Sequence, residues 1–155
     1  MANWVFNIAL GKVHQYMENV DLGSPANARL KVIPIETTGI EADATLRDYN
    51  DLSALLAGTS NEQTTMGRKT LTAADVTITI DDTNERVDID VSDITWTAAT
   101  GNAISALVLV YCPDGVTPGA DATFIPLTKH DFVVTPDGSD IVAQINAAGI
   151  YRASN

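Results

Sequence analysis

Few residues of this chain belong to the types that carry covalent or metal chemistry. Its 155 residues include one cysteine, Cys112, and two histidines, His14 and His130. A lone cysteine cannot form an intrachain disulfide, so the fold must be stabilised by packing. Two histidines and one cysteine can hold zinc only if carboxylates complete the ligand set. These absences argue against a disulfide-stapled domain and against a typical zinc site.

Positive charge is also scarce. The chain has 9 Lys and Arg residues against 20 Asp and Glu residues, and its formal net charge is −11. An acidic surface repels the phosphate backbone of DNA or RNA, so we expect no nucleic-acid partner. The same charge keeps a protein soluble at high local concentration and can steer it towards a basic partner.

Long hydrophobic runs are absent. The longest apolar stretch, residues 103–112, contains one serine and is too short to span a bilayer. The first residues carry no basic side chain and the apolar stretch there ends by Gly11 and Lys12, so no secretory signal is readable. We therefore expect synthesis in a cytoplasm and no membrane partner. Hydrophobic residues make up 45% of the chain, as in ordinary globular proteins, and the length suits a single domain over residues 1–155.

What the chain does contain is a series of short apolar segments, each ended by a turn signal. Residues 76–80 alternate apolar and polar side chains, and after the acidic stretch 81–85 the alternation resumes over residues 87–91. This pattern predicts a hairpin with one buried face and one acidic face. In residues 103–111 the side chains that would point to either face of a strand are mostly apolar, which predicts a central strand covered on both sides.

The rest of the β-rich region follows the same rhythm. The central strand is expected to end at the turn sequence 113–115. Residues 132–134 and 141–145, on either side of the turn sequence 136–139, predict a second hairpin. Residues 149–151 can form a short last strand. Strands at this spacing favour an antiparallel sandwich or barrel over alternating βαβ units.

The N-terminal segment, residues 1–28, has a mixed pattern and is expected to form an arm beside the body, residues 29–155. Its alternating apolar side chains predict a strand with one buried face at Trp4, Phe6, Ile8 and Leu10. The next apolar side chains recur at helical spacing, but ten residues do not decide between strand and helix: Val13, Tyr16, Met17 and Val20. Residues 30–35 indicate a strand, in which Pro34 favours an edge or a bulge because proline cannot donate to the ladder.

One helix is expected over about residues 46–57. Thr45 can be its N-cap, Asp48 the reciprocal cap partner and Gly58 the stop. The polar residues 59–65 that follow are expected to form a mobile loop. Together these patterns predict a mainly β fold: an antiparallel β-sandwich or jelly-roll-like domain with one packed helix and an N-terminal arm.

The few reactive side chains form no recognisable catalytic pattern. A nucleophilic site would need Cys112, or a serine near His14 or His130, together with an acid that orients the histidine. His130 and Asp131 are adjacent, so in a strand their side chains point to opposite faces and Asp131 cannot orient His130. Cys112 ends an apolar strand, which favours a buried core residue. We therefore expect no catalytic residues and no enzyme.

The carboxylates give two further hypotheses, and both have a simpler alternative. Residues 81–85 are the best candidate for a hard cation such as calcium, but they lack the central glycine and distal glutamate of the helix–loop–helix pattern, so a solvated turn is favoured. Asp88 and Asp90 share one strand face and could act as a glycosidic acid–base pair, but an outer polar face explains them equally. Gly115 and Gly119 lie in a turn-like segment rather than between a strand and a helix, so no phosphate loop is indicated. We expect neither a bound metal nor a cofactor.

Binding by shape therefore remains as the means by which this chain would act. The largest apolar side chains, Trp4, Phe6 and Trp96, can serve either an interface or the core. Trp96 continues an alternating pattern, which favours the core. For Trp4 and Phe6 the two interpretations stay open, because an aromatic N-terminal arm can strap onto a neighbouring subunit.

Several blocks of the sequence resemble small structural proteins of tailed bacteriophages, in the same order along most of the chain: residues 7–13, 41–49, 81–86, 95–99, 126–132 and 137–139. The resemblance implies a β-rich virion component, a head decoration (cement) protein or a minor structural protein. It carries over no catalytic residue.

A decoration protein attaches to a shell that already exists, so the resemblance implies two partners: the major capsid protein lattice and other copies of this chain at the capsid surface. Oligomerisation raises affinity because several weak footprints act together at high effective concentration. A trimer at a local threefold axis is the simplest match to a lattice. The candidate contact regions are the N-terminal arm, the loop 59–65 and the strand 30–35, with the candidate interface side chains Trp4, Phe6, Ile8, Leu10, Leu30, Val32 and Ile35.

Two alternatives stay open. One is a tail, baseplate or head-fibre component, and the other is a module that binds glycans or a host surface. A sugar platform needs a solvent-facing ring such as Trp96 or Tyr111, whereas a cement protein needs its rings at protein contacts. An enzyme would require a pocket in which His130 meets Cys112 or a carboxylate.

Overall fold

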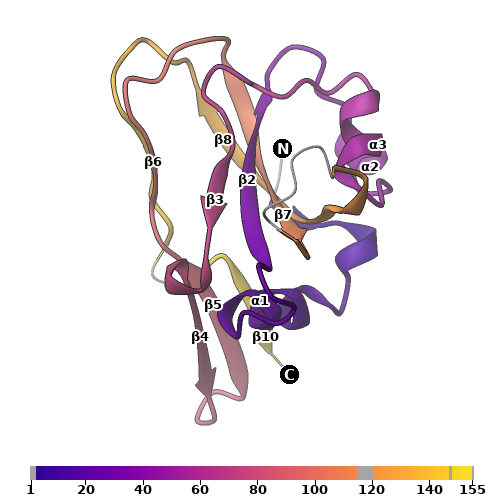
Figure 1. Ribbon diagram of the computed structural model, residues 1–155, viewed down its shortest axis with the longest axis vertical. Coiled ribbons are helices and arrows are strands. Elements are labelled where there is room, and N and C mark those ends of the chain that lie inside the picture. The colour runs from indigo at the N-terminus through magenta and orange to yellow at the C-terminus, as the bar shows by residue number, and fades with distance from the viewer. Residues whose placement is uncertain (1–2, 115–120, 147, 155) are drawn as a thin grey trace.

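The computed structural model describes residues 3–114, 121–146 and 148–154. The fold is mainly β with antiparallel sheets, as predicted (Figure 1). Its centre is a five-stranded sheet whose strands lie in the order β1 (Trp4–Val5), β8 (Ile125–Val134), β7 (Ile104–Cys112), β2 (Arg29–Glu36) and β3 (Lys69–Leu71). Gly115 and Gly119 lie outside the described residues, and so does the last residue of the turn expected at 113–115.

Strand β7 is the covered central strand that the sequence predicts. All of its residues are buried, because alternate side chains enter two different hydrophobic clusters. Leu107, Leu109 and Tyr111 face one cluster, whereas Val108 and Val110 face the other. The period of two along a strand explains this division, since successive side chains point to opposite faces of the sheet.

Two short helices cover one face of the central sheet, α2 (Asp43–Leu46) and α3 (Leu52–Ala57) (Figure 1). The single helix expected over residues 46–57 is therefore wrong in its bounds. Asp51 accounts for the break: its Oδ1 accepts a hydrogen bond from the Ala54 amide at 2.7 Å, which starts a new helix there. The expected N-cap, Thr45, lies inside α2, and Gly58 follows α3 as expected.

A third layer covers the opposite face. It contains helix α1 (Val13–Asp21), a three-stranded sheet in the order β10 (Tyr151–Ser154), β5 (Arg86–Val91) and β4 (Val76–Asp81), and a two-stranded sheet of β6 (Ile94–Trp96) and β9 (Ile141–Ala143). The predicted β4–β5 hairpin is confirmed, with Ile78 opposite Ile89 and Ile80 opposite Val87. The last strand lies at β10, slightly later than the expected residues 149–151.

The second predicted hairpin is wrong. Strand β8 pairs with β7 and β1, whereas β9 pairs with β6, so that Ile141 lies opposite Trp96. The turn sequence between β8 and β9 is still present, but Gly138 donates its amide to the carbonyl of Ala99 at 2.8 Å. The partner of β9 is therefore determined by contacts with the distant segment around residues 94–99, and not by the turn that connects β9 to β8.

Near the N-terminus the regular strand is shorter than expected. Only Trp4–Val5 pairs with β8, and the 3₁₀ turn η1 (Asn7–Ala9) follows. Three of the residues at helical spacing, Val13, Met17 and Val20, are buried on α1, which settles the open choice in favour of a helix. Further 3₁₀ turns lie at η2 (Ala73–Asp75) and η3 (Asp121–Thr123).

Strand β2 is not an edge strand, because it lies between β7 and the three-residue β3, but the other expectation holds, since its register with β7 shifts between Ile35 and Glu36, next to the proline. Pro34 lies beyond the part of β2 that pairs with β3, and the neighbour on that side is the segment around Glu62, which forms an isolated bridge with Ile35. There the Gln63 amide donates to the Pro34 carbonyl at 2.9 Å, and the Glu36 amide donates to the Asn61 carbonyl at 2.8 Å. Proline is accommodated because this short bridge uses its carbonyl and needs no amide from it.

The polar loop at residues 59–65 is anchored to the fold. Ser60 and Gln63 are 1% and 2% exposed. The Gln63 side-chain amide donates to the Asn102 carbonyl at 2.9 Å, and its Oε1 accepts from the Thr65 amide at 2.8 Å. Two side chains of the loop are therefore held by the fold, while Thr59, Asn61, Thr64 and Thr65 are exposed, so its role as a contact region stays a prediction.

Candidate functional site

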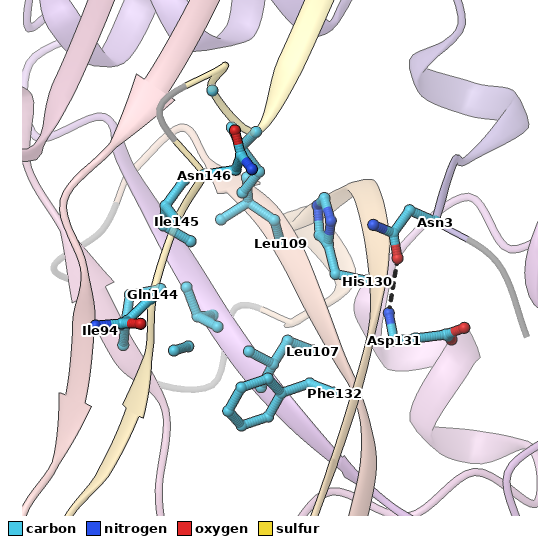
Figure 2. Close-up of a pocket in the computed structure, with 14 residues that line it drawn as sticks. Asn3, Ile94, Leu107, Leu109, His130, Asp131, Phe132, Gln144, Ile145 and Asn146 are labelled. Atoms are coloured by element: carbon cyan, nitrogen blue, oxygen red, sulfur yellow. Dashed lines mark hydrogen bonds between the residues drawn. The ribbon is translucent and has the colours of Figure 1, made fainter.

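A pocket of about 280 Å³ lies between strands β7 and β8 on one side and β9 with the segment that follows it on the other (Figure 2). Its walls are mainly apolar, and several polar groups lie among them. The lining residues that matter for its chemistry are Leu107, Leu109, His130, Phe132, Gln144 and Asn146.

Three polar side chains of this pocket, those of Asn3, His130 and Asn146, make hydrogen bonds within the protein. His130 Nε2 lies 2.8 Å from the Thr128 hydroxyl. The Asp131 amide donates to Oδ1 of Asn3 at 2.9 Å, which ties the N-terminal segment to β8 (Figure 2). Among the described lining residues there is no cysteine or serine for His130 to activate. The pocket has the walls of a small apolar binding site, and its described lining includes no serine, threonine or cysteine.

Burial in this pocket changes the acid–base behaviour of His130. Loss of hydration, together with the nearby positive charge of Lys129, lowers the pKa of His130 from 6.5 to about 4. Between these two values the unfolded chain binds a proton that the native protein does not, so the free energy of unfolding falls as pH falls.

We expect the Cε1 proton of His130 to titrate in an NMR pH series with a midpoint about 4. We also expect the free energy of unfolding of the wild-type protein to fall more steeply than that of His130→Gln as pH drops from 6.5 to about 4. Urea unfolding at several pH values measures this difference. Parallel curves for the two proteins, or an NMR midpoint near the ordinary value, would contradict the neutral buried imidazole.

Cys112 lies on the opposite side of the central sheet from this pocket. It is fully buried in the cluster formed with Val108, Val110 and Phe124, so it does not meet His130. Burial raises the pKa of the Cys112 thiol from 9.0 to about 12. The expectation of an inert core cysteine fits this environment.

A thiol whose pKa rises by this amount forms a thiolate roughly a thousandfold less often at neutral pH. We therefore expect Cys112 to react with a soluble disulfide reagent far more slowly in the native protein than in urea. The rate of colour release in both conditions measures this. Equal rates would show that the thiol is accessible in the folded protein.

The acidic turn between β4 and β5 uses its own oxygens internally. Asp81 accepts from the Asn84 side chain at 2.7 Å and lies 3.2 Å from Arg86. The hydrogen bond from Asn84 and the charge of Arg86 lower the pKa of Asp81. Within the described residues no group of three or more His, Cys, Asp or Glu side chains could hold a metal ion.

Asp88 and Asp90 each have a partner within the three-stranded sheet. Asp88 is held between Arg152 and Arg86, and these arginines lower the pKa of Asp88. Asp90 accepts a hydrogen bond from the Val91 amide at 2.9 Å. Asp88 thus links β5 to β10 through Arg152, whereas Asp90 accepts its hydrogen bond from its own strand, and both fit the alternative of a polar outer face.

Two ionic clusters join distant segments and were not found from the sequence. Arg68 bridges Glu62 and Asp121, each at 2.6 Å, and this pairing lowers the pKa of Asp121. Lys129 is fully buried on β8 and contacts both Asp131 and Asp43, the latter at 3.4 Å. The only sequence signal was the i, i+2 spacing of Lys129 and Asp131, which puts them on one side of a strand.

The structure divides the seven candidate interface residues into three groups. Four are core residues with at most 2% exposure, so they cannot contact a partner while the chain is folded: Phe6, Leu30, Val32 and Ile35. Trp4 and Ile8 are half-buried. Leu10 is 60% exposed and remains available as a surface contact.

The rings proposed as a sugar platform are buried. Trp96 is 2% exposed, and its Nε1 donates to the Gly67 carbonyl at 2.9 Å. Tyr111 is 3% exposed and stacks on Tyr16, with ring centroids 4.8 Å apart. Core packing is thus the observed role of Trp96, and neither ring offers a face to a glycan.

Comparison of the chain with protein-family models, with curated proteins and with solved structures finds no match. In the described part of the chain, none of the helices has the length and apolar character needed to cross a bilayer.

Proposed function

We propose that this chain is a structural virion protein, a capsid decoration protein that binds the outside of a phage head and reinforces contacts between capsomers. The main observation behind the proposal is that the candidate reactive side chains are packed against, or paired with, other groups of the protein. His130 and Cys112 lie in packed environments on opposite faces of the central sheet, and Asp88 is held by two arginines. Residues used in this way support a role that depends on surface and shape. The sequence blocks that resemble phage structural proteins, in the same order along the chain, support placing that role in the virion.

Charge and surface are consistent with attachment to a larger scaffold. The net charge of −11 favours contact with basic patches on the capsid lattice. Several large apolar side chains are exposed at the surface, and contact with a capsid shell would bury them. They are Leu10, Leu22, Ile80, Val133 and Val142. Each subunit would need a footprint of roughly 1,000 Å² or more to stay bound, and self-association into a trimer would multiply weak footprints.

The test uses heads of the phage that encodes this chain, prepared without the protein. Purified protein added to these heads should co-sediment in a saturable, symmetry-related number of copies, and cryo-electron microscopy should place it on the outer surface. Leu10→Glu should weaken binding, and Ser53→Glu, at an exposed site on α3, serves as the control. No saturable binding to such heads would overturn the proposal. Density on the tail, baseplate or a head fibre instead would favour the alternative structural role.

A further inference from the structure

Strand β4 lies at the edge of its sheet, and within the described residues it pairs with β5 alone. It is the outermost strand of the sheet β10–β5–β4, and the β4–β5 hairpin extends away from the central sheet at the lower end of the molecule (Figure 1). Helix α1 contacts β4, but no described element is drawn beyond the outer edge at the free end of the hairpin in this view. An exposed edge of this kind presents unpaired backbone groups that can accept another strand.

The register identifies the backbone groups that point outward. The Ser92 amide donates to the Asp75 carbonyl at 2.9 Å, and the ladder continues with Thr77 opposite Asp90 and Thr79 opposite Asp88. Because hydrogen-bonded and non-bonded pairs alternate in an antiparallel ladder, Thr77 and Thr79 bond to β5. The amides and carbonyls of Ile78 and Ile80 therefore face outward, and the hydrogen bonds of the described residues give them no partner there.

The strand lacks the features that usually block edge pairing. Residues 76–80, Val-Thr-Ile-Thr-Ile, contain no lysine, no proline and no charge, and the β4–β5 register has no bulge. Threonine and isoleucine both favour extended structure. Ile80 is 71% exposed, although it lies on the same face as the buried Val76. The apolar face of the hairpin therefore continues beyond the part that the body covers.

We propose that the β4 edges of two copies of this chain pair antiparallel about a twofold axis. Thr79 of each copy lies opposite Thr79 of the other, and Ile78 lies opposite Ile80. This register is self-complementary, because the outward amides and carbonyls of Ile78 and Ile80 then form four reciprocal hydrogen bonds. It also aligns the apolar faces of both hairpins, and the two three-stranded sheets become one continuous sheet.

Charge limits the strength of this pairing without preventing it. Asp81, at the end of the paired segment, is compensated by Arg86 at 3.2 Å. Asp82 and Glu85 lie in the turn, beyond the residues that pair. We therefore expect a weak dimer that forms at high protein concentration and strengthens as salt screens the two acidic turns. A basic partner at the same edge would show the opposite salt dependence. The pairing goes beyond the proposed function, since it joins copies two at a time and does not depend on a phage head.

Cysteine trapping tests the register. In Thr79→Cys the two new thiols would occupy a non-hydrogen-bonded pair, where Cα atoms lie about 4.5 Å apart, within the range that a disulfide spans. The matched control is Thr77→Cys, on the same strand and face, whose twofold mates would lie four residues apart along the ladder. The native Cys112 is buried and gives little background. We expect Thr79→Cys to form a disulfide dimer at least several-fold faster than Thr77→Cys under mild oxidation.

A second variant removes the pairing itself. Ile80→Pro deletes an outward donor at an exposed edge position, where proline is tolerated, and should abolish trapping in the Thr79→Cys background. Circular dichroism checks that each variant is folded. Hydrogen exchange of wild-type protein needs no variant: the amides of Ile78 and Ile80 should become protected as concentration rises. Equal trapping at the two cysteine positions, or exchange of these amides that is independent of concentration, would overturn the proposal.

Discussion

Replacing Asp43 and Asp131 together by asparagine is expected to destabilise the fold by about 3–5 kcal/mol, the usual cost of leaving a buried charge without its partner. Lys129 has 0% exposure, and its ammonium contacts both carboxylates. The two aspartates come from different parts of the fold, one on α2 and one on β8. Their neutralisation would leave the buried ammonium group without the two carboxylate charges that it contacts. Urea unfolding monitored by circular dichroism measures the loss.

The matched control places the same double substitution in a Lys129→Met background. Methionine fills much of the space of the lysine stem but carries no charge, so the two asparagines should then cost far less. The difference between the two backgrounds is the coupling energy between the lysine and its carboxylates. If the double substitution costs as much in the Lys129→Met background as in the wild-type protein, the aspartates act through other contacts and the buried ion cluster is not important for stability.

The sequence predicts well those elements whose pattern is local. Residues 76–80 and 87–91 pair as predicted because their alternation and the short turn between them specify one register. The two-sided apolar pattern of residues 103–111 identified the central strand, because a segment without a polar face must be covered on both sides. Neither prediction required knowledge of the rest of the chain.

Predictions failed where a distant segment competes with a local one. The turn at residues 136–139 suggested that β9 returns to β8, but β9 pairs with β6, about 45 residues earlier in the sequence. Similarly, the apolar spacing at residues 46–57 suggested one helix, although the capping oxygen of Asp51 divides it. In each case the apolar pattern located segments that pack against the core, although Val133 is 79% exposed, but it did not determine their partners.

The candidate surface was the hardest part to predict. Apolar residues such as Leu30 and Val32 are equally suited to a core and to an interface, and only the three-dimensional arrangement shows that they are buried. The edge of β4 was missed for the opposite reason. Its sequence pattern predicts a strand correctly. Whether that strand lies at the edge of a sheet depends on the order of the strands, which no local pattern specifies.

Replacing Trp96 by alanine is expected to destabilise the protein by about 3–5 kcal/mol, because it leaves a large cavity in the core. Trp96 is the largest of the fully buried side chains, and it lies on the two-stranded β6–β9 sheet, which is too small to be stable alone. Its ring packs within the same cluster as Leu107 and Leu109 of the central strand. Loss of the ring should therefore loosen the β6–β9 sheet from the central sheet. Urea unfolding followed by far-ultraviolet circular dichroism measures the change.

Two further variants separate the contributions of Trp96. Trp96→Phe keeps an aromatic ring but removes the hydrogen bond to the Gly67 carbonyl, so we expect a loss smaller than that of Trp96→Ala but still of about 1–3 kcal/mol. Trp4→Ala removes the same side chain from a half-buried site and should cost less than Trp96→Ala. If Trp4→Ala were the more damaging change, the N-terminal segment rather than the β6–β9 sheet would be the part of the fold that depends most on a tryptophan. The order Trp96→Ala, then Trp96→Phe, follows because the apolar area of the ring contributes more than its single hydrogen bond.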